Sequence, residues 1–331
     1  MSIILPDHRS HLNKNIIDRF RRNALRIKRS DSGTRSFPVD VSGYAVASVY
    51  TPVANRGKGY ARHMMRLLHW VLAPESSLPK VFPAEWGDPP PRVSAVGDAA
   101  FSVLFSDIKE KFYRQTGTLP NKEDGWLIAD PISTTWDVAE SYKLIFSAET
   151  RPLLQWKWLD EELARDIWDK DTTIMKEEFS SSSTSHTTNF TFLPNRGVAE
   201  FQCLRYQFIW SKMNPQPAYW GVCTKVGNDD ISDASNFATW TLDVRPPTLN
   251  VLTITRLRVQ PTRFEELFLQ IVSFAKQHSV ETIEVWNLPL YLRDISHRLG
   301  GKTFFRDEHL PCVKWYGEEH PEEISWLNNE R

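Results

Sequence analysis

The sequence predicts a mixed α/β (α+β) protein with two sheet-containing domains. A β-rich apolar run at 44–50 leads through a glycine turn into an amphipathic helical pattern and then into a second apolar run at 100–105. After residue 218 the apolar period changes to two over three consecutive segments and then returns to a helical period. Because a period of two indicates strands and a period of 3.6 indicates helices, both halves should combine the two. A chain of 331 residues commonly folds as two domains.

Composition excludes several function classes. The chain has 40 Lys and Arg against 41 Asp and Glu, so no overall field would attract nucleic acid or an anionic membrane. No apolar run reaches the roughly 20 residues of a membrane span. Cys203, Cys223 and Cys312 form no CxxC pair and the histidines form no HxxxH pair, so we expect neither a disulfide framework nor a metal site. The expected compartment is the cytoplasm.

Residues 1–42 form the first predicted region, a basic helical segment. Between residues 8 and 29 there are eight Arg and Lys and a single acid, Asp18. Four apolar side chains are spaced for one face of a helix: Ile16, Phe20, Ala24 and Ile27. A surface helix docked on the core is one interpretation. An Arg-rich, acid-poor start is also typical of mitochondrial transit peptides, so a mitochondrial location is the alternative.

The second predicted region, 43–135, is expected to hold alternating strands and helices. Thr51-Pro52 should close the first strand because proline cannot continue a ladder. Asp107 is expected to cap a short helix, with Glu110 completing a capping box and Gly117 ending the helix. The expected elements are a strand at 44–50, a helix at 60–72, a strand at 100–105 beside the first, a helix at 108–115 and a strand at 126–129.

Residues 136–195 are expected to be a helical connector with a Ser-rich loop, and 196–331 a second α/β domain. In the connector, a helix is expected at 156–179 and the loop at 180–188. Thr262 should cap the long helix of the last region, with Glu265 three residues later. The last region should contain helices at 196–213, 262–278 and 290–299, strands at 219–224, 237–244, 249–259 and 282–286, and a strand or hairpin at 302–316.

The turn between the first strand and its helix, Arg56-Gly57-Lys58-Gly59-Tyr60-Ala61, has the chemistry of an anion site. The turn places backbone N–H groups at a helix N-terminus, where the helix dipole is positive and favours an anion. Gly57 and Gly59 tolerate positive φ and let a diphosphate approach without a Cβ in the way, while Arg56 and Lys58 add charge. The spacing is not that of a Walker loop, and by itself it is equally compatible with a tight surface turn.

Two motifs in order resemble the GCN5-related N-acetyltransferases. Residues 56–61 fit that family's [RQ]-x-x-G-x-[GA] pattern, and Phe112-Tyr113-Arg114-Gln115-Thr116-Gly117 is similar to its F-Y-x-x-x-G after the next strand. More narrowly, VASVYTPVANRGKGYARHMMRLL, SVLFSDIKEKFY and ITRLRV look like the fungal lysine N-acetyltransferases. The resemblance covers 43–316 and is strongest over 43–117. It implies an acetyltransferase-like mixed sheet, reduced at its N-terminus, followed by a second acetyltransferase-like domain.

The resemblance implies acetyl-CoA as cosubstrate and the side-chain amine of free L-lysine as acceptor, in lysine metabolism or degradation. The amine would attack the thioester directly, and Tyr113 would protonate the departing thiolate. A main-chain N–H at Val49, Tyr50 or Thr51 would stabilise the carbonyl oxygen. The cofactor residues would be Val49, Tyr50, Thr51, Arg56, Gly57, Lys58, Gly59, Tyr60 and Ala61. Neither Asp40 nor Asp107 has enough support to be assigned as the base.

The second domain departs from the glycine pattern, because Gln260-Pro261-Thr262 stands where the turn would be. We therefore expect this domain to shape the acceptor pocket rather than to hold cofactor. Guanidinium groups suit carboxylates. Weak candidates for binding the acceptor's carboxylate are Arg205, Arg256 and Arg258.

The acceptor side departs from the family as well. About 42 residues precede the cofactor strand where the family has three strands and two helices. One alternative is a protein or polyamine N-acetyltransferase, for which the acids in 160–178 are the only hint. The other is a truncated, non-catalytic CoA-binding or scaffold protein. The partner expected is a small amine, without nucleic acid, membrane or metal.

Overall fold

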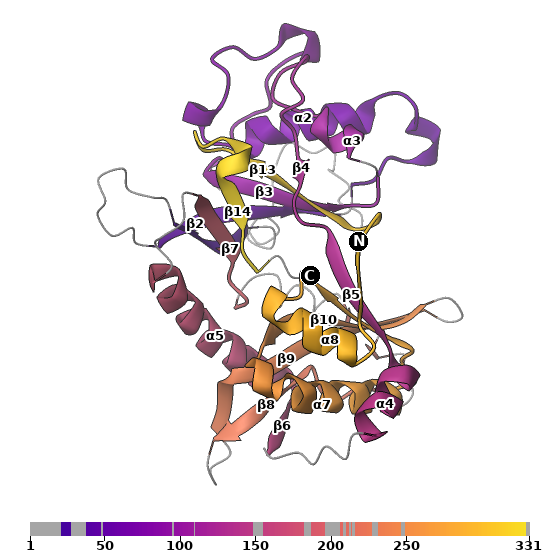
Figure 1. Ribbon diagram of the computed structural model, residues 1–331. Helices are drawn as coiled ribbons and strands as arrows, with labels where there is room; N and C mark the ends of the chain where they lie inside the picture. Colours follow the sequence, from indigo (N-terminus) through magenta and orange to yellow (C-terminus); the bar gives the residue numbers. More distant parts are fainter. Residues whose placement is uncertain are drawn as a thin grey trace. The chain divides into compact units, whose positions relative to one another are not determined.

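The computed structural model shows strands and helices gathered into two compact units (Figure 1). One unit comprises 1–131, 182–192 and 306–327, and the other comprises 132–181, 193–305 and 328–331. The units thus interleave along the chain, whereas the four regions predicted above are consecutive. The structure describes residues 21–27, 38–47, 49–94, 96–108, 110–147, 155–181, 187–195, 206–207, 210–211, 213, 216–226, 231–245 and 249–328.

The first unit is built on a mixed seven-stranded sheet. Its centre is the parallel pair β2 and β3, which register Tyr44 against Ser102. All other neighbours pair antiparallel except β7 with β14. In sheet order the strands are β14 (Ile324–Trp326), β7 (Thr188–Phe192), β1 (Arg21–Ile27), β2 (Val39–Val46), β3 (Ala99–Ser106), β13 (Leu310–Trp315) and β4 (Leu127–Ile128).

Helix α2 (Tyr60–Leu72) crosses from β2 to β3, as the helical period at 60–72 predicted. Its buried face packs in two clusters: Trp70 lies with Tyr44 of β2, and Met65 lies with Leu104 of β3. A short helix, α3 (Lys111–Arg114), follows β3. β2 ends at Val46 instead of at residue 50, where it was expected to end, and the glycine turn lies next to the start of α2, after the 3-10 turn Val53–Asn55.

Two predictions in this unit were wrong. Residues 21–27, expected to be helical, form β1, because hydrogen bonds to β2 and to β7 outweigh a local helical spacing. The predicted helix over residues 8–20 lies outside the described residues. Asp107 does not cap α3. Its carboxylate binds His309 at 2.7 Å, and the helix begins at Lys111 without a side-chain cap.

The second unit is built on another mixed seven-stranded sheet. β10 and β11 are its parallel pair, and α7 (Phe264–Gln277) crosses between them. The other helices are α4 (Val138–Ser147), α5 (Glu161–Ser181) and α8 (Arg293–Arg298). In sheet order the strands are β12 (Lys302–Phe305), β5 (Ile132–Asp137), β11 (Thr282–Trp286), β10 (Leu249–Arg258), β9 (Ile231–Arg245), β8 (Gly221–Val226) and β6 (Trp156–Leu159).

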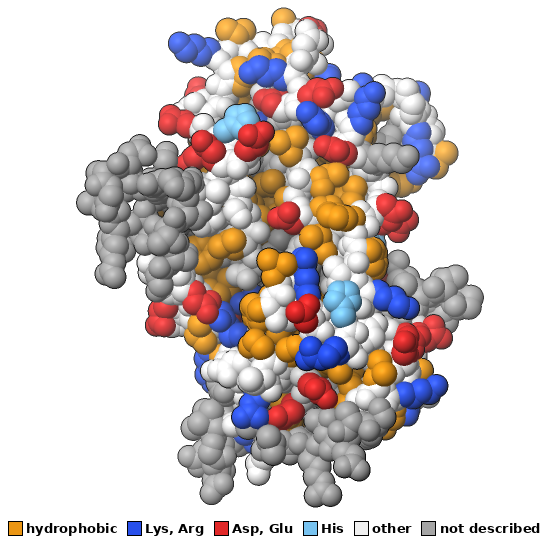
Figure 2. Space-filling model, viewed as in Figure 1, with side chains coloured by type: hydrophobic (Ala, Val, Ile, Leu, Met, Phe, Trp, Pro, Cys, Tyr) orange, Lys and Arg blue, Asp and Glu red, His pale blue; other side chains and the backbone are white. Residues whose placement is uncertain are grey.

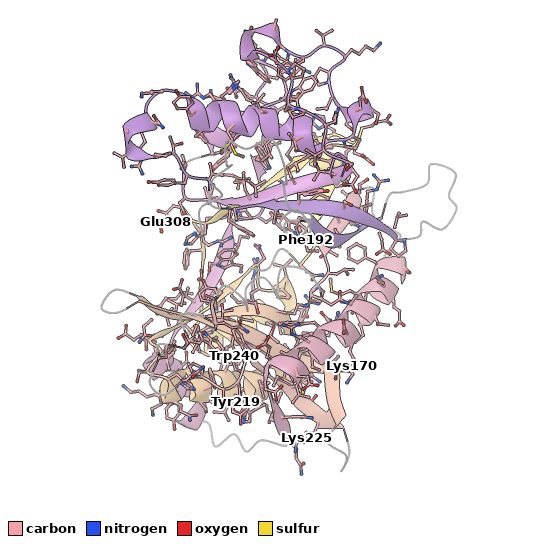
Figure 3. All side chains as sticks on the ribbon, turned by 180° about the vertical axis from the view of Figure 1, so that it is seen from behind. Lys170, Phe192, Tyr219, Lys225, Trp240 and Glu308 are labelled. Atoms are coloured by element: carbon pink, nitrogen blue, oxygen red, sulfur yellow. The ribbon has the colours of Figure 1, made fainter. Side chains whose placement is uncertain are left out.

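Aromatic side chains fill the core of the second unit. The ring of Trp240 on β9 lies 4.9 Å from Phe274 of α7 and 6.3 Å from Trp158 of β6, and Trp158 also contacts Tyr219 (Figure 3). Trp240 and Phe274 are 1% and 3% exposed, so α7 is held against the sheet by buried apolar area.

Element predictions in the second unit were mostly confirmed. Strands β8 to β11 and the two helices after residue 260 lie where they were expected. The first four residues of the predicted helix 156–179 form β6 instead. The region 302–316 forms two strands, but β12 joins the second sheet and β13 joins the first, so they are not a hairpin. Most of 196–213 lies outside the described residues.

Candidate functional site

The glycine turn adopts the left-handed backbone that its sequence predicts. The φ angles of Gly57 and Gly59 are +76° and +82°, and Gly59 is the N-cap of α2. No atom lies within 4 Å of the position that a Cβ would occupy at either glycine. Glycine is therefore required by the backbone conformation and not by a crowded neighbour, and the space beside both residues is open.

Unpaired backbone N–H groups follow this turn. The first hydrogen bond of the helix runs from His63 N–H to the Gly59 carbonyl at 3.0 Å, so the amides of Tyr60, Ala61 and Arg62 precede the helical ladder. Within the described part of the chain, no acceptor binds these three amides. The first turn of α2 also holds no acid. These features together favour an anion at this end of the helix.

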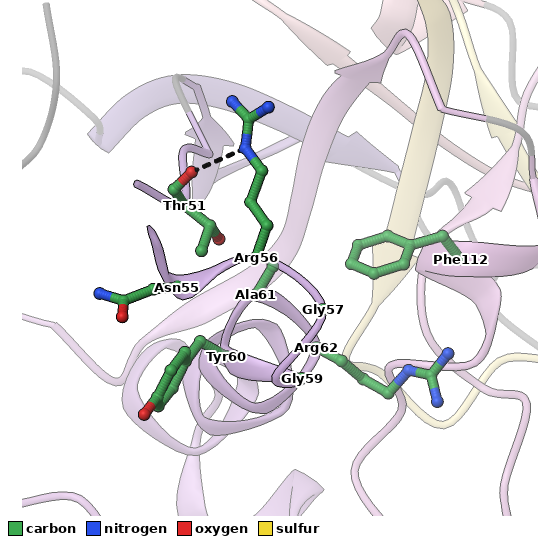
Figure 4. Close-up of a pocket in the computed structure, with 9 residues that line it drawn as sticks. All are labelled: Thr51, Asn55, Arg56, Gly57, Gly59, Tyr60, Ala61, Arg62 and Phe112. Carbon is green, nitrogen blue, oxygen red and sulfur yellow. Dashed lines mark hydrogen bonds between the residues drawn. The ribbon is translucent and has the colours of Figure 1, made fainter. Parts of the chain in front are cut away.

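A pocket of about 410 Å³ lies at the turn (Figure 4). The ring of Phe112 on α3 points toward the turn, so the pocket joins the two motifs that the sequence singled out. Arg62 adds a second guanidinium to its wall. The lining residues are Thr51, Asn55, Arg56, Gly57, Gly59, Tyr60, Ala61, Arg62 and Phe112.

Arg56 is held by the chain that precedes the turn. Its Nε donates to the Thr51 carbonyl at 3.2 Å (Figure 4). Its guanidinium also lies 5.9 Å from the centre of the Tyr50 ring. These contacts leave the terminal nitrogens of Arg56 for an anion. Of the predicted cofactor residues, Val49, Tyr50 and Lys58 do not line the pocket, although Tyr50 contacts Arg56.

Asn55, Arg62 and Phe112 line the pocket but were not predicted as cofactor residues. Arg62 lies in the first turn of the helix, and that position is a signal which sequence reasoning could have used. Asn55 and Phe112 enter the wall only through the folding of the 3-10 turn Val53–Asn55 and of α3. Their contribution therefore depends on tertiary structure.

Tyr113 lies on α3 beside Phe112 and is 6% exposed. It packs in an apolar cluster with Trp126 and Cys312, against which Val49 also packs. Burial raises the pKa of Tyr113, and the neighbouring Cys312 and Asp107 raise this pKa further. The hydroxyl therefore stays protonated at neutral pH, as a proton donor must. Burial also raises the pKa of the Cys312 thiol, to about 12, so this cysteine is no nucleophile.

The candidate carboxylate-binding arginines of the second unit have partners inside the protein. Arg256 Nε lies 2.6 Å from Asp171 Oδ2, and Arg258 Nε lies 2.6 Å from Asp171 Oδ1. Arg258 also binds Glu178 through two nitrogens. Both guanidinium groups thus join β10 to α5, and we do not assign them to substrate. Arg205 lies outside the described residues.

The turn before α7 lacks the properties of the glycine turn. Pro261–Arg263 forms a 3-10 turn, and the Gln260 N–H donates to Asn236 Oδ1 at 3.0 Å. Thr262 does not cap α7 as predicted, because the N-cap is Arg263 and makes no side-chain cap bond. Two acids, Glu265 and Glu266, occupy the first turn of α7 and oppose an anion there.

Charges of both signs are mixed on the visible surface, with Lys and Arg side chains interspersed with Asp and Glu on the face shown in Figure 2. No described helix combines the length and apolar character that spanning a bilayer needs. Within the described ranges, no group of three or more His, Cys, Asp or Glu is placed to hold a metal ion.

Comparisons with known proteins give one matching family model and a group of similar solved structures. Residues 145–331 match the family model described as the LYC1 GNAT-like C-terminal domain. No curated protein matches significantly. A similar solved structure is a conserved protein of unknown function from Enterococcus faecalis V583, described as a probable N-acyltransferase, with 10% identity and a TM-score of 0.43. The alignment covers 89% of this chain, which spans 59% of the length of that protein.

Proposed function

This chain belongs to the LYC1 GNAT-like family, and from that premise we propose that it is an acetyl-CoA-dependent N-acetyltransferase. The observation that carries the proposal is the pocket in the first unit. Its wall combines the open glycine turn with Phe112, the neighbour of Tyr113. A diphosphate-binding turn and a buried, protonated tyrosine on the next helix are the parts that acetyl transfer from a CoA thioester requires.

The residues of the first unit take the following roles in this proposal. The amides of Tyr60, Ala61 and Arg62 bind the diphosphate, with Arg56 and Arg62 adding charge-assisted bonds. Main-chain N–H groups of 49–51 stabilise the thioester oxygen as the amine attacks. Tyr113 donates its proton to the departing thiolate as the bond between the carbonyl carbon and sulfur breaks.

The acceptor that we propose is the side-chain amine of free L-lysine. Support comes from the resemblance of 43–117 to the fungal lysine N-acetyltransferases and from residues 145–331, which match the family's C-terminal domain. A lysine ε-amine has a pKa near 10.4, so it must lose its proton before it attacks.

The acidic stretch 160–178 was the hint for a protein or polyamine acceptor. On α5, Glu161 binds Arg165 at 2.8 Å, Asp166 binds Lys170 at 2.7 Å, and Asp171 is buried between two arginines. These three acids are thus paired within the second unit, so they add no support to that alternative.

A single assay tests the proposal. The full chain is incubated with acetyl-CoA and either L-lysine, spermidine or a lysine-containing peptide, and the products are measured by mass spectrometry. We expect N6-acetyllysine from free lysine. Product only on the peptide or only on spermidine would contradict the proposed acceptor. CoA binding without any product would support the non-catalytic alternative.

The role of Tyr113 has its own variant. Tyr113→Phe removes the proposed acid and keeps the ring, so kcat should fall about 100-fold, within the range of general acid catalysis. The dissociation constant of acetyl-CoA should stay unchanged. An unchanged kcat would show that Tyr113 serves only to pack beside Phe112.

A further inference from the structure

A closed ring of hydrogen bonds occupies the core of the first unit beside α2. Its six residues are between 0% and 6% exposed, so the side-chain and backbone atoms that form the ring depend on one another for hydrogen bonds. The members come from α2, β3, α3, the segments after α3 and the residue after β13: His69, Ser102, Tyr113, Thr116, Trp126 and Tyr316.

The hydrogen bond between His69 and the Thr116 carbonyl fixes the tautomer of His69. The Thr116 carbonyl can only accept, and it lies 2.7 Å from His69 Nε2, so this nitrogen carries the proton. Burial, with a smaller effect from the positive charge of Lys314, lowers the pKa of His69 from 6.5 to about 3. The imidazole is therefore neutral, and its Nδ1 accepts.

The remaining bonds follow from that assignment. Tyr316 Oη lies 2.9 Å from His69 Nδ1, so the hydroxyl must donate to it. Tyr316 Oη then accepts from the Ser102 hydroxyl at 3.0 Å. Ser102 Oγ in turn accepts from Trp126 Nε1, which can only donate, also at 3.0 Å. Each hydroxyl in this part of the ring thus has one possible orientation.

The ring closes on the backbone of Tyr113. Thr116 Oγ1 donates to the Tyr113 carbonyl at 2.7 Å, and the backbone N–H of Trp126 donates to the same oxygen at 3.2 Å. The Trp126 ring stacks on His69 with 4.2 Å between centroids and meets Tyr113 edge-on at 6.4 Å. Within the described part of the chain, the Tyr113 hydroxyl makes no hydrogen bond, so backbone bonds and packing alone fix its ring.

We propose that His69 and Thr116 are positioning residues that hold Tyr113 at a fixed place relative to the helix of the glycine turn, an inference that rests on the proposed acetyltransferase function. His69 belongs to α2, and the N-terminus of this helix lines the pocket. His69 donates to the Thr116 carbonyl, and the Thr116 hydroxyl donates to the Tyr113 carbonyl. The ring thereby joins the diphosphate-binding part of the site to the proton donor. Small displacements of a reacting group cost large factors in rate, so this connection controls kcat rather than cofactor affinity.

Thr116→Val tests the last bond of the ring. Valine keeps the shape of threonine and the backbone N–H that donates to the Tyr113 carbonyl at 3.1 Å, but it loses the hydroxyl that donates to the same oxygen at 2.7 Å. We therefore expect kcat to fall about tenfold with an unchanged dissociation constant for acetyl-CoA. Thr116→Ser keeps the hydroxyl and should restore kcat. The matched control is Thr118→Val. Thr118 is also buried in this segment, but its hydroxyl binds Asp124 Oδ2 at 3.1 Å and does not reach Tyr113.

His69 offers a complementary pair of substitutions. Glutamine places its amide near the position of Nε2 and can still donate to the Thr116 carbonyl, whereas asparagine reaches only the position of Nδ1. We expect His69→Gln to keep more of kcat than His69→Asn. In the Tyr113→Phe background, Thr116→Val should lower kcat no further, because both changes act through the same group.

Equal kcat in Thr116→Val and Thr118→Val, or additive losses with Tyr113→Phe, would overturn the proposal. Hydrogen exchange at the Trp126 amide gives a second measurement that needs no turnover, since this amide binds the Tyr113 carbonyl. Thr116→Val should speed its exchange more than Thr118→Val. If the wild-type protein binds CoA but transfers no acetyl group, the proposed function fails, and equal exchange in the two variants then separately overturns the positioning role.

Discussion

Both units contain a strand–helix–strand crossover, but the turn that leads into the helix differs between them. In the first unit, antiparallel β1 and β2 lead through α2 to parallel β3, and in the second, antiparallel β9 and β10 lead through α7 to parallel β11. The strand-to-helix turn is the part that differs. The first turn has two glycines at positive φ and no acid, whereas the second has a proline, a hydrogen-bonded N–H and two glutamates.

This difference teaches that the crossover alone does not make an anion site. Both helices present a positive dipole end, but α7 satisfies it with its own side chains, and Arg263 binds Glu266 at 2.9 Å. In α2, Arg62 lines the pocket and no acid competes with a ligand. The residues of the two turns therefore decide which helix N-terminus is open to an anion, within crossovers that are otherwise alike.

The largest effect is expected from placing an acid in the first turn. Gly57→Glu or Gly59→Glu puts a carboxylate where a diphosphate would bind and also strains a positive φ, so acetyl-CoA affinity should fall at least about 100-fold. Titration calorimetry measures this loss. Gly87→Glu is the matched control, because Gly87 also has a positive φ of 84° and open space but lies outside the pocket. Equal losses in all three variants would mean that strain alone, rather than the turn, governs binding.

A second difference between the crossover helices lies on their buried faces. The buried face of α2 carries His69, whereas that of α7 is apolar except for Glu266. With a folded pKa of about 3 against 6.5 when unfolded, His69 binds a proton in the unfolded state first as pH falls. The contribution of His69 to the free energy of unfolding is therefore fully present above pH 6.5 and is lost as the pH falls toward 3. About 2 kcal/mol of it is lost between pH 6.5 and pH 5.

Hydrogen exchange of α2 amides at pH 6.5 and pH 5 measures that loss, after correction for the intrinsic exchange rate. His69→Gln has no titrating group at this position, so its α2 amides should show a smaller change with pH. If the α2 amides of His69→Gln and of the wild-type protein change their exchange equally between pH 6.5 and pH 5, the assignment of His69 as a buried neutral base is contradicted.

The smallest effect concerns the two arginines near the helix N-termini. Arg62→Ala removes one charge from the pocket wall and should weaken acetyl-CoA binding about three- to tenfold, with a smaller dependence on salt. Arg263→Ala removes the charge at the corresponding helix of the second unit and should leave binding unchanged. A loss in Arg263→Ala equal to that in Arg62→Ala would erase the distinction between the two turns.

Local patterns predicted the crossovers and the turn because their signals lie within a few residues. Glycine spacing, the helical period after residue 60 and the period of two after 218 each act locally. β1 was missed because its apolar spacing resembles a helix and because one of its two partners, β7, is remote in sequence. The pairing of β13 with β3 and the hydrogen-bond ring through His69 join segments up to 247 residues apart, which no local pattern can indicate.

Backbone amide chemical shifts of nitrogen-15-labelled protein, followed while CoA is titrated, test the central claim most directly. We predict that the amides of Gly57, Gly59, Tyr60 and Ala61 shift strongly at low CoA concentration, while those of Arg263 and Phe264 at the start of α7 do not. Shifts confined to the α7 turn, or no shift at residues 57–61 when CoA is bound, would contradict the account.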